Sequence, residues 1–292
     1  MSAKERVYVI GGTGNIGEKV VHDLLLNGVQ TTVYARSPAK VTNKHHDTSN
    51  LLTVVQGDYD DLGPFEQSIE GHTRLLLIIS DYNRMVQLKT AFAKLAYQAG
   101  AKQIVDISSQ TVSLGWRSTY IGATHAAAEQ AILNLAGGNY VALRPAKFMT
   151  NHLWQEFHLI KYENRFEGMA APDEKQGYIS TNDIAALAAK VLQDPVEKHG
   201  DAVYEMLSCA ITPEERAAAF SKVLGRTITY RQRTAEEQYR AMIDLGLPHL
   251  LAYSLTSLGK GTATLNEGLP ILLGRQPETF EEWLDKNKEV FL

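Results

Sequence analysis

The chain has 292 residues, 44% of them apolar and 21% charged, and its 29 Lys and Arg against 33 Asp and Glu give a formal net charge of −4. This ordinary globular composition, slightly acidic, argues against a protein that binds nucleic acid through its phosphates. No apolar run approaches the ~20 residues that span a bilayer, so we expect no membrane partner. The only cysteine, Cys209, excludes a disulfide within the chain and weakly indicates a cytoplasmic location.

Short β-branched runs alternate with longer amphipathic stretches in the first half of the chain. This repetition predicts a parallel sheet with helices on both faces, a doubly wound α/β fold of the Rossmann type. The loops after such strands lie along one edge of the sheet, where ligands bind. The predicted strands are residues 7–10, 31–35, 52–56, 75–80, 103–107 and 140–143, and the clearest helices between them are residues 17–27, 88–99 and 126–135.

The pattern becomes mainly helical after about residue 150. We predict a Rossmann core at residues 1–150 and a smaller substrate-binding cap at residues 151–292, which also adds strands to the sheet and covers a pocket. Residues 246–274, rich in Gly and Leu, are a candidate lid. The predicted helices of the second half are residues 153–162, 183–192, 213–224 and 235–245, and the short strands are residues 178–180 and 227–231.

Three glycines, Gly11, Gly14 and Gly17, lie between the first predicted strand and the first helix. Glycines at this spacing allow a tight turn, a close approach of backbone amides to a pyrophosphate, and close packing of helix on strand. The helix N-terminus adds unpaired N–H groups and a partial positive charge, which favour an anion. We therefore predict a dinucleotide-binding loop; the alternative is merely a tight turn. The loop residues assigned to the cofactor are Gly11, Thr13, Gly14, Asn15 and Ile16.

Basic residues, and no acidic residue, follow the second predicted strand. Arg36 and Lys40 lie where a dinucleotide-binding protein selective for NAD carries a carboxylate for the ribose 2′-hydroxyl. A guanidinium can grip a 2′-phosphate with a bidentate geometry, which favours NADP over NAD by about ten-fold or more. The alternative is a solvated basic loop.

Two further loops contribute cofactor candidates. Asp58 follows the third predicted strand, where its carboxylate could accept a hydrogen bond from the adenine amino group; a simple turn aspartate is the alternative. Ile79 and Ser80 close the fourth strand, and their backbone is expected to pass the pyrophosphate and ribose. Both assignments rest on position alone.

Several stretches of the chain together resemble the NmrA-like atypical short-chain dehydrogenase/reductases. They are residues 11–17 (GGTGNIG), 35–40 (ARSPAK), 57–58 (GD), 125–129 (HAAAE), 143–149 (LRPAKFM) with Asn151, 183–185 (DIA) and 273–280 (LGRQPETF). The His-x-x-x-Glu pattern is similar to the branch with triphenylmethane reductase and the type 2 quinone oxidoreductases, whereas isoflavone-reductase-like members have Lys at that position. The resemblance implies an NADPH-binding core, a small C-terminal substrate region, and reductase or redox-sensing activity.

The Tyr-x-x-x-Lys pair of conventional short-chain dehydrogenases is absent, because Tyr120 is followed four residues later by Thr124. The resemblance implies that His125 faces the nicotinamide or its ribose, with Glu129 one helical turn on, close enough to orient or charge it. Three roles for His125 stay open: a proton donor, a donor that orients the cofactor, or a core histidine satisfied by Glu129. Hydride transfer needs no protein acid when the acceptor is conjugated, so we favour such an acceptor over a simple ketone.

Two serines, Ser108 and Ser109, follow the fifth predicted strand. A hydroxyl there can bind a substrate or cofactor oxygen, or it can cap a helix or turn. We assign Ser108 to the cofactor. Ser109 is better placed for catalysis if the conventional register of the family holds, and the candidate catalytic residues are therefore His125, Tyr120 and Ser109.

The segment after the sixth predicted strand is expected to border the reactive end of the site. Pro145 and Phe148 are assigned to the cofactor, with His125. Phe148, Met149 and Trp154 are expected to form an apolar wall for an aromatic substrate, although each could instead belong to the core.

Metal binding is not expected. The adjacent His45 and His46 lie in a polar stretch, and His152 and His158, six residues apart, fall on different faces of a helix.

The sequence thus favours an NADPH-dependent oxidoreductase that transfers hydride to a conjugated small molecule such as a quinone, enone, imine or dye. The alternative is a non-catalytic NADP(H)-binding sensor that acts through a protein partner. We expect a small-molecule substrate, no nucleic acid and no membrane, with a homodimer or a regulatory partner as further options.

Overall fold

The structure, a computed structural model of the chain, describes residues 5–44, 50–258, 263 and 268–292. Its strands are β1 (Arg6–Ile10), β2 (Gln30–Ala35), β3 (Leu52–Gln56), β4 (Arg74–Leu77), β5 (Gln103–Ile107), β6 (Asn139–Pro145), β7 (Lys147–Phe148), β8 (Arg165–Gly168), β9 (Gln176–Ile179), β10 (Val203–Met206), β11 (Cys209–Ile211) and β12 (Thr229–Gln232).

Helices connect these strands. The α-helices are α1 (Gly17–Leu26), α2 (Ala39–Thr42), α3 (Gly63–Ser68), α4 (Met85–Gln98), α5 (Tyr120–Leu133), α6 (His152–Gln155), α7 (Phe157–Glu163), α8 (Thr181–Val191), α9 (Val196–His199), α10 (Pro213–Leu224), α11 (Ala235–Asp244), α12 (His249–Ser257), α13 (Gly268–Leu273) and α14 (Phe280–Phe291). Two 3₁₀ helices, η2 (Gln110–Leu114) and η3 (Met149–Asn151), follow β5 and β7.

A seven-stranded sheet with the order β10-β6-β5-β4-β1-β2-β3 forms the centre of the fold. The pairs β1–β2, β1–β4, β2–β3, β4–β5 and β5–β6 are parallel. The order reverses next to β1, at the point where doubly wound sheets bind dinucleotides. The predicted doubly wound fold is confirmed.

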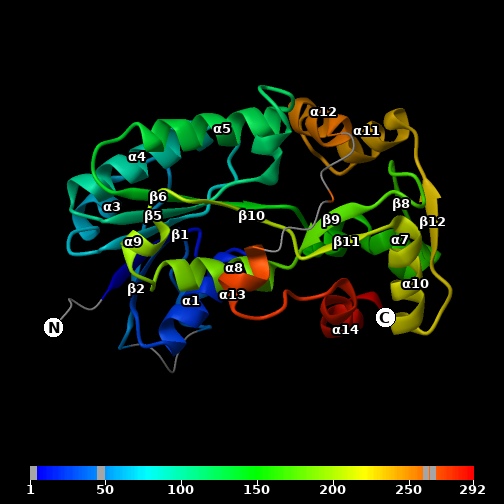
Figure 1. The fold of residues 1–292 in the computed structure, drawn as a ribbon, viewed down its shortest axis with the longest axis horizontal. Coiled ribbons are helices and arrows are strands. Elements are labelled where there is room, and N and C mark those ends of the chain that lie inside the picture. Colours follow the sequence, from blue (N-terminus) through cyan, green and yellow to red (C-terminus); the bar gives the residue numbers. More distant parts are fainter. Residues whose placement is uncertain (1–4, 45–49, 259–262, 264–267) are drawn as a thin grey trace. The chain divides into compact units, whose positions relative to one another are not determined.

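Both faces of the sheet are covered, and the alternation of side chains along β1 shows this. Tyr8 and Ile10 point into a cluster with Phe65 of α3 and Phe92 of α4. Val9 points to the other face, toward α1. Helices α3 and α4 lie on one side of the sheet and α1 and α8 on the other (Figure 1). Strands buried on both faces read as continuous apolar runs, as β1 and β4 do.

The chain divides into two compact units. The first unit comprises Met1–Ser109, Thr124–Arg144 and Ile184–Tyr204, and the second comprises Gln110–Ala123, Pro145–Asp183 and Glu205–Leu292. The units interleave along the chain. The single boundary near residue 150 stays a prediction.

The second unit has small sheets of its own, β11-β9-β7 and β12-β8. Its core contains Phe166, Tyr178, Phe220, Phe280 and Trp283, with further apolar residues. Helices α10, α11 and α14 each begin with a threonine capping box, in which a Thr side chain and a Glu three residues later satisfy each other's backbone N–H groups.

Two expectations for the second half need adjustment. The predicted helix at residues 153–162 is split into α6 and α7 at Glu156, where φ is −119°. The candidate lid contains α12 and α13, whereas residues 259–262 and 264–267 lie outside the described residues.

Candidate functional site

The glycine loop between β1 and α1 is closely packed against its surroundings. Gly11 has φ +86°, and a Cβ there would lie 2.5 Å from the carbonyl oxygen of Ile78. A Cβ at Gly17 would lie 2.2 Å from the carbonyl oxygen of Gly11. Both positions therefore require glycine.

The tip of this loop has the features of a diphosphate cradle. Thr13, Gly14 and Asn15 are exposed, and Ile16, at the N-cap position, is buried and provides no side-chain cap for α1. The first backbone N–H groups of α1 are thus not covered by a capping side chain, and the loop fits the diphosphate of a dinucleotide.

Arg36 and Lys40 are both exposed, directly after β2 and in α2. Burial raises the pKa of Tyr59, and the positive charge of Arg36 counteracts this rise, which places Arg36 near the loop after β3. A guanidinium in this position suits the 2′-phosphate assignment, which stays a prediction.

Asp58 organises the turn after β3. Its Oδ1 accepts hydrogen bonds from the backbone N–H groups of Asp60 at 2.9 Å and Asp61 at 3.3 Å. The hydroxyl of Tyr34 donates to the carbonyl oxygens of Asp58 at 3.0 Å and Asp61 at 2.9 Å. The turn role weighed for Asp58 is therefore present, and the adenine contact stays a prediction.

Arg84, which our sequence reasoning missed, links two of the expected cofactor loops. Its Nη1 lies 2.5 Å from Asp60 Oδ1, after β3, and its Nε lies 2.8 Å from Asp81 Oδ2, after β4. Ile79 in the second loop is buried and Ser80 is exposed. The spacing of Asp81 and Arg84 was the available signal.

His125 is a buried residue of α5. Its side chain packs edge-on against Tyr82, with ring centroids 5.9 Å apart. Its Nδ1 has no hydrogen-bond partner among the described residues. Burial, together with the positive charge of Lys89, holds the pKa of His125 well below its ordinary value. The imidazole is therefore uncharged at neutral pH.

Glu129 does not charge or orient His125, which corrects one of our expectations. Its carboxylate binds Arg144, with Arg144 Nε 3.0 Å from Oε1 and Nη2 2.6 Å from Oε2, and Oε1 accepts a hydrogen bond from the hydroxyl of Ser108 at 2.5 Å. Among the described residues Glu129 has no hydrogen bond with His125, whose Nδ1 has no partner. The possibility of a core histidine satisfied by Glu129 is therefore wrong.

A second buried group of charges lies close to His125. Lys89 of α4 and Asp106 of β5 are both fully buried, with Lys89 Nζ 2.6 Å from Asp106 Oδ1. Helix and strand periodicity did not predict this pair. Its signal was a charged residue among the mostly apolar buried residues of α4 and β5.

The second unit holds the three expected substrate residues and one catalytic candidate, Tyr120. Tyr120 begins α5 and is half-buried, Phe148 of β7 is half-buried, and Trp154 is 48% exposed. Met149 is completely buried and packs in the core of this unit. We therefore remove Met149 from the substrate wall, because a side chain enclosed by the core cannot contact a substrate.

The remaining assignments are placed as follows. Ser109 is half-buried at the end of the Met1–Ser109 segment of the first unit, and Pro145 is buried at the end of β6. Tyr120, Pro145, Phe148 and Trp154 belong to the second unit, whereas His125, Ser108 and Ser109 belong to the first. Their catalytic and binding roles stay predictions.

Among the described residues, no group of three His, Cys, Asp or Glu side chains is arranged to hold a metal ion. His45 and His46 lie outside the described residues. His152 binds Glu156. In the same part of the chain, no helix combines the length and the apolar character needed to cross a membrane.

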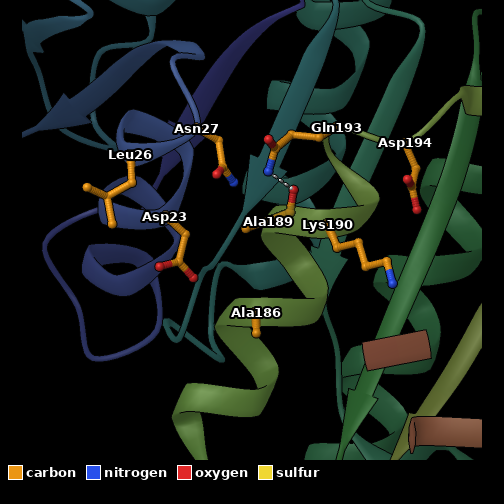
Figure 2. Close-up of a pocket in the computed structure, with 8 residues that line it drawn as sticks. All are labelled: Asp23, Leu26, Asn27, Ala186, Ala189, Lys190, Gln193 and Asp194. Carbon is orange, nitrogen blue, oxygen red and sulfur yellow. Dashed lines mark hydrogen bonds between the residues drawn. The ribbon is translucent and has the colours of Figure 1, made fainter. Parts of the chain in front are cut away.

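A pocket of about 390 Å³ lies in the first unit, lined by the C-terminal ends of α1 and α8 (Figure 2). Asp23 and Asn27 border it from the α1 side, and Lys190 and Gln193 from the α8 side. The glycine loop lies at the opposite end of α1. This pocket is therefore separate from the expected cofactor site.

The sequence model of the NmrA-like family matches residues 3–284 of this chain. The chain belongs to the NmrA-like family. This confirms the resemblance drawn from the glycine loop and the His-x-x-x-Glu segment.

Relatives of this NmrA-like chain include several oxidoreductases. The NAD(P)H azoreductase of Xenophilus azovorans is 25% identical over 291 residues, which cover 98% of this chain and 99% of the relative. The NADPH-dependent quinone oxidoreductase of Escherichia coli in complex with NADPH has a TM-score of 0.82 and 25% identity, covering 97% of this chain and 99% of that one. The triphenylmethane reductase of Citrobacter sp., complexed with NADP(H), has a TM-score of 0.80 and 22% identity, with 96% and 99% covered, and shares the fold.

Proposed function

We propose that this chain reduces a conjugated small-molecule acceptor, such as a quinone, enone, imine or dye, with hydride from NADPH. The oxidoreductase class and the NAD(P)H cofactor are confirmed by the azoreductase and quinone oxidoreductase relatives. The type of acceptor is the further step. The observation that carries it is the state of His125, which is buried and uncharged and has no acidic partner in Glu129.

The protonation state of His125 limits the chemistry. Reduction of a simple ketone produces an alkoxide, which needs a proton from a nearby acid as the negative charge develops. An uncharged imidazole on a buried helix face is a poor acid for this purpose. A quinone, iminium ion or conjugated dye delocalises the incoming electron pair, so its reduction makes a much smaller demand on the protein.

The chain's own residues then have binding and positioning roles. NADPH, when bound, supplies the hydride. The exposed loop residues 13–15 and the start of α1 are proposed to hold its diphosphate, and Arg36 its 2′-phosphate. His125 and Ser108 are proposed to face the nicotinamide ribose. The hydroxyl proton of Ser108 is directed to Glu129, which leaves its oxygen free to accept a hydrogen bond.

The test is to mix the pure protein with NADPH and a panel of quinones, enones, imines, cationic dyes and simple ketones, and to follow the loss of reduced nicotinamide absorbance. We expect turnover with conjugated acceptors and none with unactivated ketones. His125→Ala should slow turnover. The matched control is His158→Ala, which removes a histidine side chain that is 73% exposed and should leave turnover unchanged. Preferential reduction of simple ketones would contradict the proposal.

The sensor alternative makes a different prediction. If no acceptor consumes NADPH while NADP⁺ and NADPH bind with clearly different affinities, the chain acts as a dinucleotide sensor. A regulatory protein partner or a homodimer would then be sought with the cofactor present and absent.

A further inference from the structure

Tyr82, which sequence reasoning did not single out, is in direct contact with His125. The two ring centroids lie 5.9 Å apart and the ring planes are inclined by 81°, so the edge of one ring meets the face of the other. Both residues belong to the first unit. Tyr82 follows β4 and His125 lies in α5, after β5, so the contact joins two neighbouring connections at the carboxyl edge of the sheet.

The position of Tyr82 along the sheet indicates the nicotinamide half of a dinucleotide site. The strand order reverses between β4 and β1, and doubly wound sheets bind a dinucleotide across this point, with one nucleotide over each half. Ile78, four residues before Tyr82, lies against the glycine loop, because its carbonyl oxygen would be 2.5 Å from a Cβ at Gly11. Arg36 follows β2 in the other half. The half with Tyr82 is therefore the one left for the nicotinamide and the acceptor.

The turn that carries Tyr82 is held by the residues on either side of it. The backbone N–H of Arg84 donates to the carbonyl oxygen of Asp81 at 3.2 Å, and Arg84 Nε donates to Asp81 Oδ2 at 2.8 Å. Arg84 Nη1 also donates to Asp60 Oδ1 at 2.5 Å. Ion pairs between exposed side chains add little to the stability of a protein. Their effect here is local, because they fix the backbone from which the Tyr82 ring extends.

The surroundings of Tyr82 differ from those of a core aromatic residue. Asn83 and Arg84, which follow it, are exposed, and Tyr82 itself is half-buried. In the described part of the chain, the apolar cluster between the sheet and α4 includes Phe92 but not Tyr82. Tyr82 therefore keeps exposed surface beside the buried imidazole of His125.

We propose that Tyr82 is a specificity-determining residue, whose ring packs against a flat acceptor with two or more fused rings beside His125. Aromatic rings attract each other both edge-to-face and in offset stacks. Because the planes of Tyr82 and His125 are nearly perpendicular, a flat molecule that is parallel to one ring is perpendicular to the other, and both contacts are favourable. An acceptor with a single ring has less surface to place in this corner. The inference rests on the proposed function, because it concerns the acceptor of the same site.

Two quinones compare an extended acceptor with a single-ring acceptor: dimethylnaphthoquinone, which has two fused rings, and duroquinone, which has one. Both are fully methylated on the quinone ring, which blocks addition of the Cys209 thiol. With saturating NADPH, kcat/KM is measured for each quinone, and the ratio of the two-ring to the one-ring value is compared between proteins. Tyr82→Leu removes the aromatic ring and should lower this ratio by about five- to ten-fold, mainly through the KM of the two-ring quinone.

Two further variants separate the ring from other effects. Tyr82→Phe keeps the ring, and its ratio should stay within about two-fold of the wild type. Tyr162→Leu removes a tyrosine that is 62% exposed in the second unit and is the matched control. The NADPH dissociation constant should be the same in Tyr82→Leu and the wild type. An unchanged ratio in Tyr82→Leu, an equal fall in Tyr162→Leu, or a loss of NADPH affinity as large as the loss for the two-ring quinone would overturn the proposal.

A binding experiment distinguishes this inference from the proposed function. NADP⁺ has no hydride to transfer, so its complex with the full chain can be titrated with dimethylnaphthoquinone without reaction, and binding is followed by NMR of the His125 ring, whose signals His125→Gln identifies. We expect Tyr82→Leu to raise the dissociation constant of this quinone by about five- to ten-fold and Tyr82→Phe to leave it unchanged.

The outcomes of the binding and turnover experiments are separate. If the quinone binds as expected but no acceptor consumes NADPH, the proposed function fails and the role of Tyr82 stands. If acceptors are reduced but Tyr82→Leu behaves as the wild type, the proposed function stands and the role of Tyr82 fails. Absence of quinone binding to the wild-type complex would also overturn the role of Tyr82.

Discussion

Glu129 and Arg144 form a two-point ion pair in which each carboxylate oxygen receives its own guanidinium N–H, at 3.0 and 2.6 Å. The Glu129 side chain is 6% exposed and that of Arg144 is 18% exposed, so solvent screens the pair weakly. The pair also fixes Ser108, whose hydroxyl donates to Glu129. The acidic residue of the His-x-x-x-Glu segment, Glu129, thus binds residues of β6 and of the loop after β5.

Removal of Arg144 should be costly. Arg144→Leu leaves the Glu129 carboxylate buried without its cation, and we expect the free energy of unfolding to fall by about 3–5 kcal/mol. Urea unfolding followed by circular dichroism measures this change. The control is Arg240→Leu, which breaks an exposed ion pair with Glu236 and should leave the midpoint almost unchanged. Similar midpoints for the two variants would contradict the importance of the Glu129–Arg144 pair.

Substitution by alanine at two glycines of the same loop should have different effects on stability and on NADPH affinity. In Gly17→Ala the new Cβ would meet the Gly11 carbonyl oxygen at 2.2 Å, so we expect a loss of about 1–3 kcal/mol in stability. In Gly14→Ala the nearest atom, also the Gly11 carbonyl oxygen, lies at 3.5 Å, an ordinary contact. That variant should keep its stability and lose NADPH affinity, because the methyl group enters the space proposed for the diphosphate. Thermal unfolding and calorimetric titration separate the two effects.

Arg36 should determine the choice between the two nicotinamide cofactors. We expect Arg36→Ala to raise the NADPH dissociation constant by about ten-fold or more, with little change for NADH, because the lost contact is to the 2′-phosphate alone. Calorimetric titrations with both nucleotides provide the comparison. Equal losses for NADPH and NADH would refute the assignment.

Acid should destabilise the second unit through His152. Burial lowers the pKa of this residue, so its folded-state pKa is below the unfolded value of about 6.5. The stabilisation from a neutral His152 is therefore present above pH 6.5 and is lost as the pH falls toward the folded-state pKa. Its share of the slope approaches about 1.4 kcal/mol per pH unit.

The measurement is urea unfolding between pH 7.5 and pH 5, followed by tryptophan fluorescence, to which Trp283 contributes from a buried position with its ring centroid 6.0 Å from that of His152. His152→Gln should reduce the pH slope, whatever its effect on stability at pH 7.5. His158→Gln, at an exposed position, should keep the wild-type slope. A slope that is unchanged in His152→Gln would show that this residue does not titrate as expected.

The central sheet could be predicted well because its signals are local. The six predicted strands match β1 to β6 within a few residues, since buried parallel strands appear as short apolar runs. The glycine loop was equally clear, because its positions demand glycine for steric reasons. The split of α6 from α7 was missed, because apolar spacing does not reveal a local change of backbone angle such as φ −119° at Glu156.

The site was less predictable where partners come from distant elements. His125 and Glu129, four residues apart on one helix, suggested a pair, yet Glu129 binds Arg144, which comes from β6. Lys89 and Asp106 meet across 17 positions of sequence, and nothing local connects them. Charged residues in buried elements mark such places but do not identify their partners.

The interleaved order of the two units decides which pieces of this protein can exist alone. The stretch Ile184–Tyr204 reaches the central sheet from late in the chain, where the carbonyl of Ala202 accepts the N–H of Ala142 at 3.0 Å and the carbonyl of Asp194 accepts from Arg74 at 3.3 Å. A fragment that stops at residue 150 would lack this stretch and would leave the sheet face and edge that it covers open to water. Such a fragment should aggregate when produced in isolation, and a dinucleotide-binding module cut from this protein must carry residues 184–204 by permutation or by a designed connection.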